Sequence, residues 1–260
     1  MQIIDETTEL GVTERRFDLK AGDQAVPGLH WLPEAASAPH PTVLIGHGGT
    51  QHKRAPNVLG LARKLVRELG YGAVALDAPR HGDRMTGEQR REVEAFRAAR
   101  QERPGAPLPP MPRGRREFMA GLALQAVAEW QALLDALAAE PQWAGGPFGY
   151  WGVSMGTSFG IPLLAAEPRI SAAVLGLNAL REGSEQQRAD AAAITVPLLF
   201  LFQWDDELMT RDEGLALWDA FGSAEKTMHV NPGPHVGIPQ FERDAAVAFY
   251  RRHLSGPQGA

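Results

Sequence analysis

The chain has 260 residues, a net charge of −5 and no cysteine. This length accommodates one large α/β domain, and because no linker-like stretch divides the sequence we expect a single domain over residues 1–260. Without thiols the chain has no disulfides, no thiolate-bound metals and no cysteine nucleophile. The acidic balance argues against a nucleic-acid partner.

Residues 1–19 carry acidic side chains where a secretory signal would have a basic start and an apolar core. Nor does any run of the sequence approach the roughly 18 apolar residues of a membrane span. We therefore expect a cytoplasmic protein that does not associate with membranes. The oligomeric state stays open.

Short apolar segments alternate with helix-like segments along the chain. Strands are expected at 13–19, 28–32, 42–45, 73–76, 147–153, 172–177, 197–202 and 226–230, the first two as a hairpin at a sheet edge. Helices are expected at 56–69, 115–139, 155–166, 212–221 and 240–253. The alternation predicts an α/β fold, with a mostly parallel sheet of about eight strands covered by helices on both faces.

The segment 83–114 does not fit this alternation. Residues 88–103 predict a charged helix, and the prolines of 104–112 predict an extended stretch. Two interpretations stay open, a solvated surface excursion and a lid over the site, because long loops in compact domains often carry function. Residues 255–260 are expected to form a flexible tail.

Polar residues follow several of the predicted strands, and ligands of parallel sheets bind beyond the carboxyl ends of the strands. They include His47, Asp77, Ser154, Asn178, Asp205, Asp206 and His235. A serine attacks a carbonyl carbon when an imidazole removes its proton, and the imidazole needs a carboxylate that fixes its tautomer. The set therefore contains the groups that nucleophilic catalysis requires.

Ser154 stands in Gly-Val-Ser-Met-Gly at 152–156, where a strand is followed by a helix. In such a nucleophile elbow, a sharp turn strains the serine backbone and leaves no room for a Cβ two positions before or after it. The serine hydroxyl then stands clear of the chain.

The chain order Ser154, Asp206, His235 resembles the α/β-hydrolase family, in its serine-esterase and dienelactone-hydrolase-like branch. The resemblance spans essentially the whole sequence and implies Ser154 as nucleophile, His235 as general base and Asp206 as the acid that orients it. Family members commonly have glycine where Gln203 stands, and this departure leaves Asp205 as the alternative acid.

Negative charge on the substrate carbonyl oxygen needs backbone N–H donors. We expect one from Met155 and the second from Gly49, because Gly-His-Gly-Gly at 46–49 resembles the oxyanion-loop motif of the family. The match is partial, since Thr50 takes the place of a further glycine, and a plain glycine turn is the alternative.

Four more side chains are candidates for substrate contact. They are His47, Arg80, His81 and Trp204. The turn-forming loop at 77–83 favours a structural role, with substrate contact by its basic residues as the alternative. The polar run at 51–54 either binds an anionic group or begins a solvated helix, and Trp204 either lines an acyl pocket or packs as an ordinary rim residue.

No metal or cofactor is expected. His47 and His52 lack the i, i+4 spacing of a zinc-binding helix, and no phosphate-binding glycine motif follows a strand. The resemblance implies a serine hydrolase of the carboxylesterase type that forms an acyl-enzyme on a small-molecule ester. Short acyl groups are expected, because the connection 177–196 is too short for a large cap. A thioesterase, an amidase or peptidase, and a non-catalytic ligand-binding protein are the alternatives.

Overall fold

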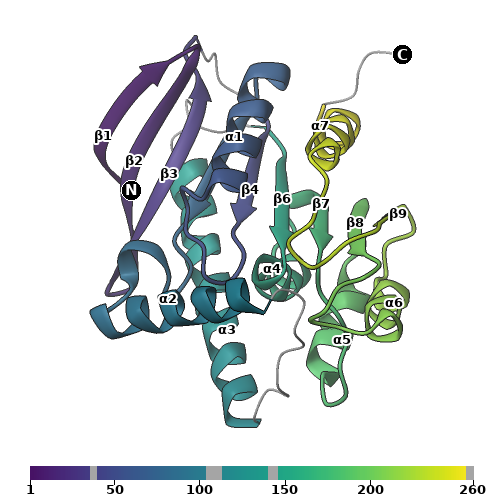
Figure 1. Ribbon diagram of the computed structural model, residues 1–260. Coiled ribbons are helices and arrows are strands. Elements are labelled where there is room, and N and C mark those ends of the chain that lie inside the picture. The colour runs from purple at the N-terminus through teal and green to yellow at the C-terminus, as the bar shows by residue number, and fades with distance from the viewer. Residues whose placement is uncertain (36–39, 104–112, 140–145, 256–260) are drawn as a thin grey trace.

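The computed structural model describes residues 1–35, 40–103, 113–139 and 146–255, which form one mixed sheet flanked by helices (Figure 1). The strands are β1 (Gln2–Glu9), β2 (Val12–Ala21), β3 (Gln24–Pro33), β4 (Thr42–Gly46), β5 (Gly72–Leu76), β6 (Phe148–Val153), β7 (Ile170–Gly176), β8 (Leu198–Gln203) and β9 (Lys226–Asn231). The helices are α1 (Pro56–Leu69), α2 (Gly87–Glu102), α3 (Arg113–Ala138), α4 (Met155–Ala166), α5 (Glu185–Ala193), α6 (Arg211–Ala220) and α7 (Phe241–Leu254), with a 3-10 turn at Gly82–Arg84.

The strand order is β1-β2-β3-β5-β4-β6-β7-β8-β9. Strands β5, β4, β6, β7, β8 and β9 pair in parallel. Strands β1, β2 and β3 pair antiparallel with one another, and β3 also pairs antiparallel with β5. The predicted fold class, a mostly parallel sheet with helices on both faces, is confirmed. The parallel strands end on a common side, and the loops that follow them meet there.

The predicted hairpin of β2 and β3 is present, but it is not the edge of the sheet. Strand β1 covers β2, and the described chain contains nine strands instead of the expected eight. The side chains of β1 are nearly all exposed and polar, so no apolar alternation marks it in the sequence. Its pairing with β2 forms the strand. Helix α5 was missed for a similar reason, since it buries only Ala191.

Apolar side chains fill both faces of the sheet. Helices α1 and α7 cover one face, over a core that includes Trp31, Val174 and Tyr250. Helices α3, α4, α5 and α6 follow one another across the other face, over a core that includes Tyr150 and Phe200. Strands β4 to β8, buried on both faces, therefore lack the polar alternation of a half-exposed sheet.

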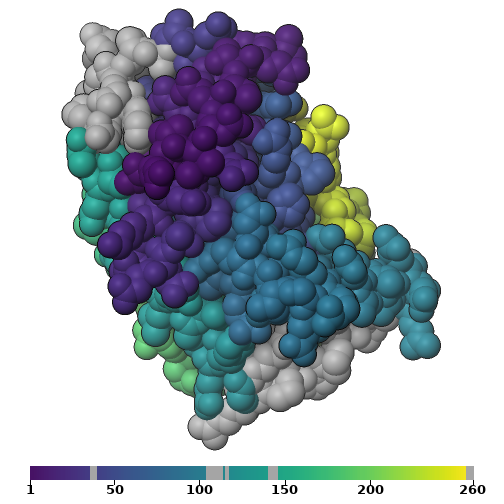
Figure 2. Space-filling model, turned by 90° about the vertical axis from the view of Figure 1, so that its left-hand side faces the viewer, coloured from purple at the N-terminus to yellow at the C-terminus, as the bar shows by residue number. Residues whose placement is uncertain are grey.

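The predicted charged helix of the segment 83–114 is α2. A capping box between Thr86 and Gln89 starts it, and none of its residues is buried. In Figure 1 it lies across the side on which the parallel strands end, and in Figure 2 its atoms (blue) lie on the surface below β1–β3 (purple). The predicted extended stretch at 104–112 and all but the first residue of the predicted tail at 255–260 lie outside the described residues.

Three buried polar side chains, on β3 and at the start of β4, have no hydrogen-bond partner among the residues that the structure describes. They are His30, His40 and Thr42. A Cβ placed on Gly72 would lie 2.7 Å from Thr42 Oγ1 and 2.9 Å from His40 Nε2, so these two atoms lie close together beside Gly72. Burial, together with His40 and Arg15 nearby, lowers the pKa of His30 to about 3. The folded protein therefore holds His30 neutral.

This neutral histidine makes the fold sensitive to acid. Between pH 6.5 and about 3 the unfolded chain takes up a proton that folded His30 does not, so the free energy of unfolding falls as the pH falls, by about 2 kcal/mol at pH 5. In His30→Leu we expect the melting temperature at pH 8 to stay close to that of the wild type, because the substitution leaves no additional polar atom unpaired. The fall in melting temperature from pH 8 to pH 5 should be several degrees smaller in His30→Leu than in the wild type. Thermal melts at both pH values measure this, with exposed His52→Leu as the control. Equal drops in wild type and His30→Leu would contradict the expectation.

Candidate active site

Ser154 occupies the strained turn that the sequence predicts. It precedes α4 with φ 57° and ψ −116°. A Cβ on Gly152 would lie 2.5 Å from the carbonyl oxygen of Gly156, and a Cβ on Gly156 would lie 2.5 Å from the carbonyl oxygen of Gly46. Real Cβ atoms do not approach oxygen so closely. Both glycines of the motif are therefore required by the packing of β6, α4 and the end of β4.

Hydrogen bonds from β7 and α4 hold this turn. The amide of Ser154 donates to the carbonyl of Gly176 over 2.9 Å, and Asn178 Nδ2 donates to the carbonyl of Ser154 over 3.1 Å. The hydroxyl of Thr157 is 2.7 Å from the carbonyl oxygen of Gly152 and accepts the Gly176 amide over 2.9 Å. The orientation of the serine is thus determined by the neighbouring strand as well as by its own turn.

Three predicted residues, from the loops after β6, β8 and β9, meet in one hydrogen-bonded chain. His235 Nε2 is 2.9 Å from Ser154 Oγ, and His235 Nδ1 is 2.7 Å from Asp206 Oδ2. The other carboxylate oxygen of Asp206 accepts the Leu208 amide over 2.8 Å. The side chains of His235 and Asp206 are 8% and 2% exposed, so the carboxylate faces the ring in an environment nearly free of water.

The neighbouring acid, Asp205, points elsewhere. Its side chain is half exposed, accepts the amide of Gly233 over 3.0 Å and lies 3.3 Å from Arg211. The geometry therefore favours Asp206 over the alternative that the sequence left open. Gln203, the residue that departs from the family pattern, is buried, and its Nε2 donates to the Pro234 carbonyl beside the histidine.

Two uncommitted backbone amides lie beside the serine. Gly49 is adjacent to Met155, because a Cβ placed on Gly49 would be 4.0 Å from the Met155 Cβ. Within the described ranges neither amide N–H has an acceptor, whereas the amide of Gly48, the residue before Gly49, donates to Gln51 Oε1 over 3.1 Å. Of the donors in this loop, Gly49 is thus free and Gly48 is not. Their action on a substrate oxygen stays a prediction.

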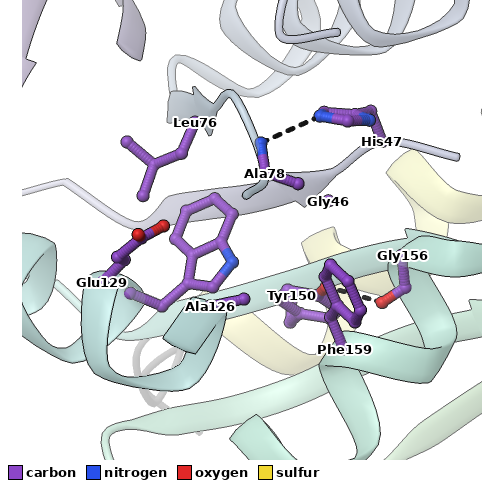
Figure 3. A pocket seen from close by; sticks show the side chains of 10 residues that line it. Gly46, His47, Leu76, Ala78, Ala126, Glu129, Tyr150, Gly156 and Phe159 are labelled. Carbon is purple, nitrogen blue, oxygen red and sulfur yellow. Dashed lines mark hydrogen bonds between the residues drawn. The ribbon is translucent and has the colours of Figure 1, made fainter. Parts of the chain in front are cut away.

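His47 was predicted as a candidate for substrate contact, but its ring nitrogens are bonded to the backbone. The ring is buried, its Nδ1 is 2.9 Å from the Gly48 carbonyl oxygen, and its Nε2 accepts the amide of Ala78 over 3.1 Å (Figure 3). Because an amide can only donate, Nε2 carries no proton and Nδ1 must donate. Burial lowers the pKa of His47 to about 4, so this tautomer is neutral. Both ring nitrogens are engaged by backbone groups, and the residue ties the loop after β4 to the loop after β5.

In the polar run at 51–54, His52 and Arg54 are exposed, as a solvated helix entry predicts, whereas Lys53 fits neither interpretation, since it neither faces solvent nor is available to an anionic substrate. It is buried, and its Nζ lies 2.7 Å from Asp77 and 2.6 Å from Asp83. Its amide donates to the same Asp77, which is fully buried. Gly82, with φ 57°, passes so close that its Cβ would lie 2.1 Å from that carboxylate. This ion-paired cluster locks the loop at 77–83, in agreement with the structural role favoured for it.

The other candidate contacts, Arg80, His81 and Trp204, do not join the serine, histidine and aspartate in any described contact. Arg80, with φ 63°, lies 5.2 Å from the ring centre of Phe118. The His81 ring stands 5.4 Å from that of His47, and its burial lowers its pKa. Trp204 is 42% exposed and stacks under Arg211. Their contact with substrate stays a prediction.

A small cavity lies behind the loop that follows β4, between the sheet and helices α3 and α4 (Figure 3). Its volume is about 10 Å³, roughly the room that one water molecule needs. It is lined by Gly46, His47, Leu76, Ala78, Ala126, Glu129, Trp130, Tyr150, Gly156 and Phe159. The hydroxyl of Tyr150, which the sequence analysis did not single out, donates to the Gly156 carbonyl over 2.7 Å and braces the turn from below.

Glu207 was also missed as a functional candidate, although it directly follows the predicted acid. Its carboxylate accepts the amide of His235 over 2.8 Å.

In the part of the chain that the structure describes, no cluster of three or more His, Asp or Glu residues is arranged to hold a metal ion. The described helices include none that is long and apolar enough to cross a membrane.

Comparisons with known proteins place this fold. A cold-adapted esterase from an Arctic intertidal metagenomic library, solved in complex with PEG, is 34% identical, with a TM-score of 0.79 and coverage of 98% of this chain and 100% of that one. Esterase YjfP of Escherichia coli (strain K12) is 24% identical over 88% of this chain and 96% of its own length. The dienelactone hydrolase of Anabaena variabilis shares the fold at 16% identity and a TM-score of 0.64, over 94% of this chain and 100% of its own.

No family model matches the sequence. The cold-adapted esterase, however, is similar along its entire length, and its identity to this chain is high enough to establish common membership. The chain belongs to the α/β-hydrolase family of esterases.

Proposed function

We propose that this protein is a serine esterase in which Ser154, His235 and Asp206 form the catalytic triad. The observation that carries the proposal is the continuous hydrogen-bonded chain from Ser154 Oγ through the imidazole to the buried Asp206 carboxylate. The relatives named as esterases supply independent support for ester hydrolysis.

In the proposed acylation step, Ser154 Oγ attacks the carbonyl carbon of the ester while its proton passes to His235 Nε2. Asp206 stabilises the resulting imidazolium and holds Nδ1–H toward itself. The amides of Met155 and Gly49 stabilise the negative charge on the carbonyl oxygen. When the tetrahedral intermediate collapses, the C–O bond to the alcohol breaks and His235 returns the proton to the leaving oxygen.

Deacylation repeats these roles with water. His235 removes a proton from water, the hydroxide attacks the acyl carbon, and the acid leaves as Ser154 Oγ recovers its proton. Each of these steps uses only groups of this chain and water, so the proposed reaction needs no cofactor.

Small acyl groups suit the site best. The connection between β7 and β8 contributes only α5, a helix of 9 residues, where a large cap would be needed to enclose a long chain. We therefore propose a small-molecule carboxylic ester with a short acyl group as the substrate, and a thioester or amide as the alternative for the same triad.

Ser154→Ala tests the nucleophile. We expect kcat/KM for p-nitrophenyl acetate to fall at least about 10³-fold, because no other group replaces the attacking oxygen. Labelling by a fluorophosphonate probe should also disappear. Ser184→Ala is the control, since Ser184 makes no side-chain cap to its helix. Undiminished turnover or labelling in Ser154→Ala would remove the serine from the mechanism.

Substitutions at the two adjacent aspartates test which of them is the acid of the proposed triad. In Asp206→Asn the imidazole loses the carboxylate that fixes its tautomer, and we expect kcat to fall by about 10⁴-fold. In the matched variant Asp205→Asn, which changes the same charge one residue away, kcat should stay within about threefold of the wild type. Steady-state kinetics on the same ester measure both. The reverse ranking would transfer the role to Asp205.

Acyl length tests the substrate class. Across p-nitrophenyl esters from acetate to decanoate we expect kcat/KM to be highest for the acetate to butyrate members. Longer chains would have to remain in water or displace packed side chains. Matched acetyl thioester and acetanilide substrates, assayed in parallel, identify the bond that is cleaved. A maximum at decanoate would show that the site encloses a long chain, contrary to the proposal.

A further inference from the structure

Glu207 connects the acid loop to the histidine loop at a second point. Asp206 contacts the ring of His235, while the next residue, Glu207, accepts the backbone amide of His235 with Oε2 over 2.8 Å. The side chain of Glu207 is only 9% exposed. Two successive carboxylates thus hold one histidine, the first by its imidazole and the second by its main chain.

The carboxylate of Glu207 is held in its charged form. Burial by itself would raise the pKa of Glu207, but the hydrogen bonds from the His235 amide and from its own amide, together with the charges of Arg100 and His235, lower it below its usual value. A hydrogen bond to an ionised acceptor is roughly twice as strong as one between neutral groups. Glu207 therefore restrains the backbone of His235 more firmly than a neutral side chain would.

Helix α2 supplies the cation that holds Glu207. The guanidinium of Arg100 pairs with Glu207 Oε1, the oxygen that His235 does not use. One turn earlier on the same side of the helix, Arg97 donates to the carbonyl of Thr50 in the loop that carries Gly49. One helix therefore contacts both the histidine side and the oxyanion side of the site.

Apolar packing contributes little to the position of this helix. None of the residues of α2 is buried, and Figure 2 shows it on the surface of the molecule. Arg97 and Arg100 make charged and polar contacts from this helix to the site loops. The position of α2 and the position of the histidine loop are therefore coupled through Glu207.

We propose that Glu207 is a positioning residue that holds His235 in line with Ser154, and that Arg100 of α2 acts on turnover through Glu207. This inference rests on the proposed esterase function. A general base must stay within a few tenths of an ångström of its hydrogen-bonded geometry, and a small displacement lowers the rate steeply. The charged helix of the insert thus contributes to the rate of the chemical step and not only to covering the site.

Glu207→Ala and Glu207→Gln test the positioning role. Removing the acceptor in Glu207→Ala should lower kcat for p-nitrophenyl acetate about tenfold while KM stays within about twofold, because His235 moves and the ester-binding surface does not. Glu207→Gln keeps an acceptor for the His235 amide and should recover most of this loss. Circular dichroism and thermal melts verify that both variants are folded.

The pH profile separates positioning from a purely structural role. In the described parts of the chain, the charged groups that contact His235 are Asp206, at its ring, and Glu207, at its amide, with Arg100 paired to the latter. Removal of the Glu207 charge destabilises the imidazolium, so the acid limb of kcat/KM should move to lower pH in both Glu207 variants. A structural role would lower the amount of active protein and leave this limb in place.

A double-mutant cycle tests the route from α2. Arg100→Met should lower kcat about threefold in the wild type and change it much less in Glu207→Ala, because its effect passes through that carboxylate. Arg91→Met is the matched control, since it removes the same charge from an exposed position of the same helix and should leave kcat unchanged. Additive effects of Arg100→Met and Glu207→Ala would overturn the proposed route.

The outcomes distinguish this inference from the function on which it rests. Full kcat and an unmoved pH profile in Glu207→Ala, alongside an inactive Ser154→Ala, would refute the positioning role and leave the esterase intact. Retained turnover in Ser154→Ala would instead refute the proposed function itself.

Discussion

The strained turn at Ser154 is the constraint around which the rest of this site is arranged. A positive φ at a residue other than glycine costs about 1–3 kcal/mol, and it persists only where the surroundings enforce it. Here a Cβ on Gly152 or Gly156 would clash with a neighbouring backbone carbonyl, and a Cβ on Gly46 would clash with the hydroxyl of Tyr150. The apolar packing of α4 against β4 and β6 therefore offsets the strain, and the nucleophile candidate is held by the core of the fold.

The loops around this turn are joined by polar groups that are buried and paired. Lys53 and Asp77 tie the start of α1 to the end of β5, and neutral His47 links the same two regions through backbone hydrogen bonds. A buried charge or imidazole without partners would destabilise the fold, so each pairing restrains the loop that carries it. The result is a set of loops whose donors and acceptors are in place before a substrate arrives, which is the condition for electrostatic stabilisation of a transition state.

Helix α2 differs from the elements beneath it in how it is held. The sheet and its covering helices are stabilised by apolar burial, which ionic screening does not weaken, whereas α2 buries no residue and reaches the site through arginines. Contacts of this kind are screened by ions and open at low free-energy cost compared with a packed core. Helix α2, which lies in the insert, is thus exposed on its outer side and bonded to the site loops through Arg97 and Arg100.

The sequence by itself determined the parallel core, the turn at Ser154 and the order of serine, acid and histidine, because apolar periodicity and glycine spacing are local properties of the chain. Only the tertiary structure shows the edge strand β1, the contact of Asp206 and not Asp205 with the ring of His235, the burial of Lys53 and the contacts of Glu207. The edge strand has no apolar signal and depends on its partner. The others depend on groups 24 to 107 residues away in sequence, and that proximity arises only once the strands pair and bring their loops to one end of the sheet.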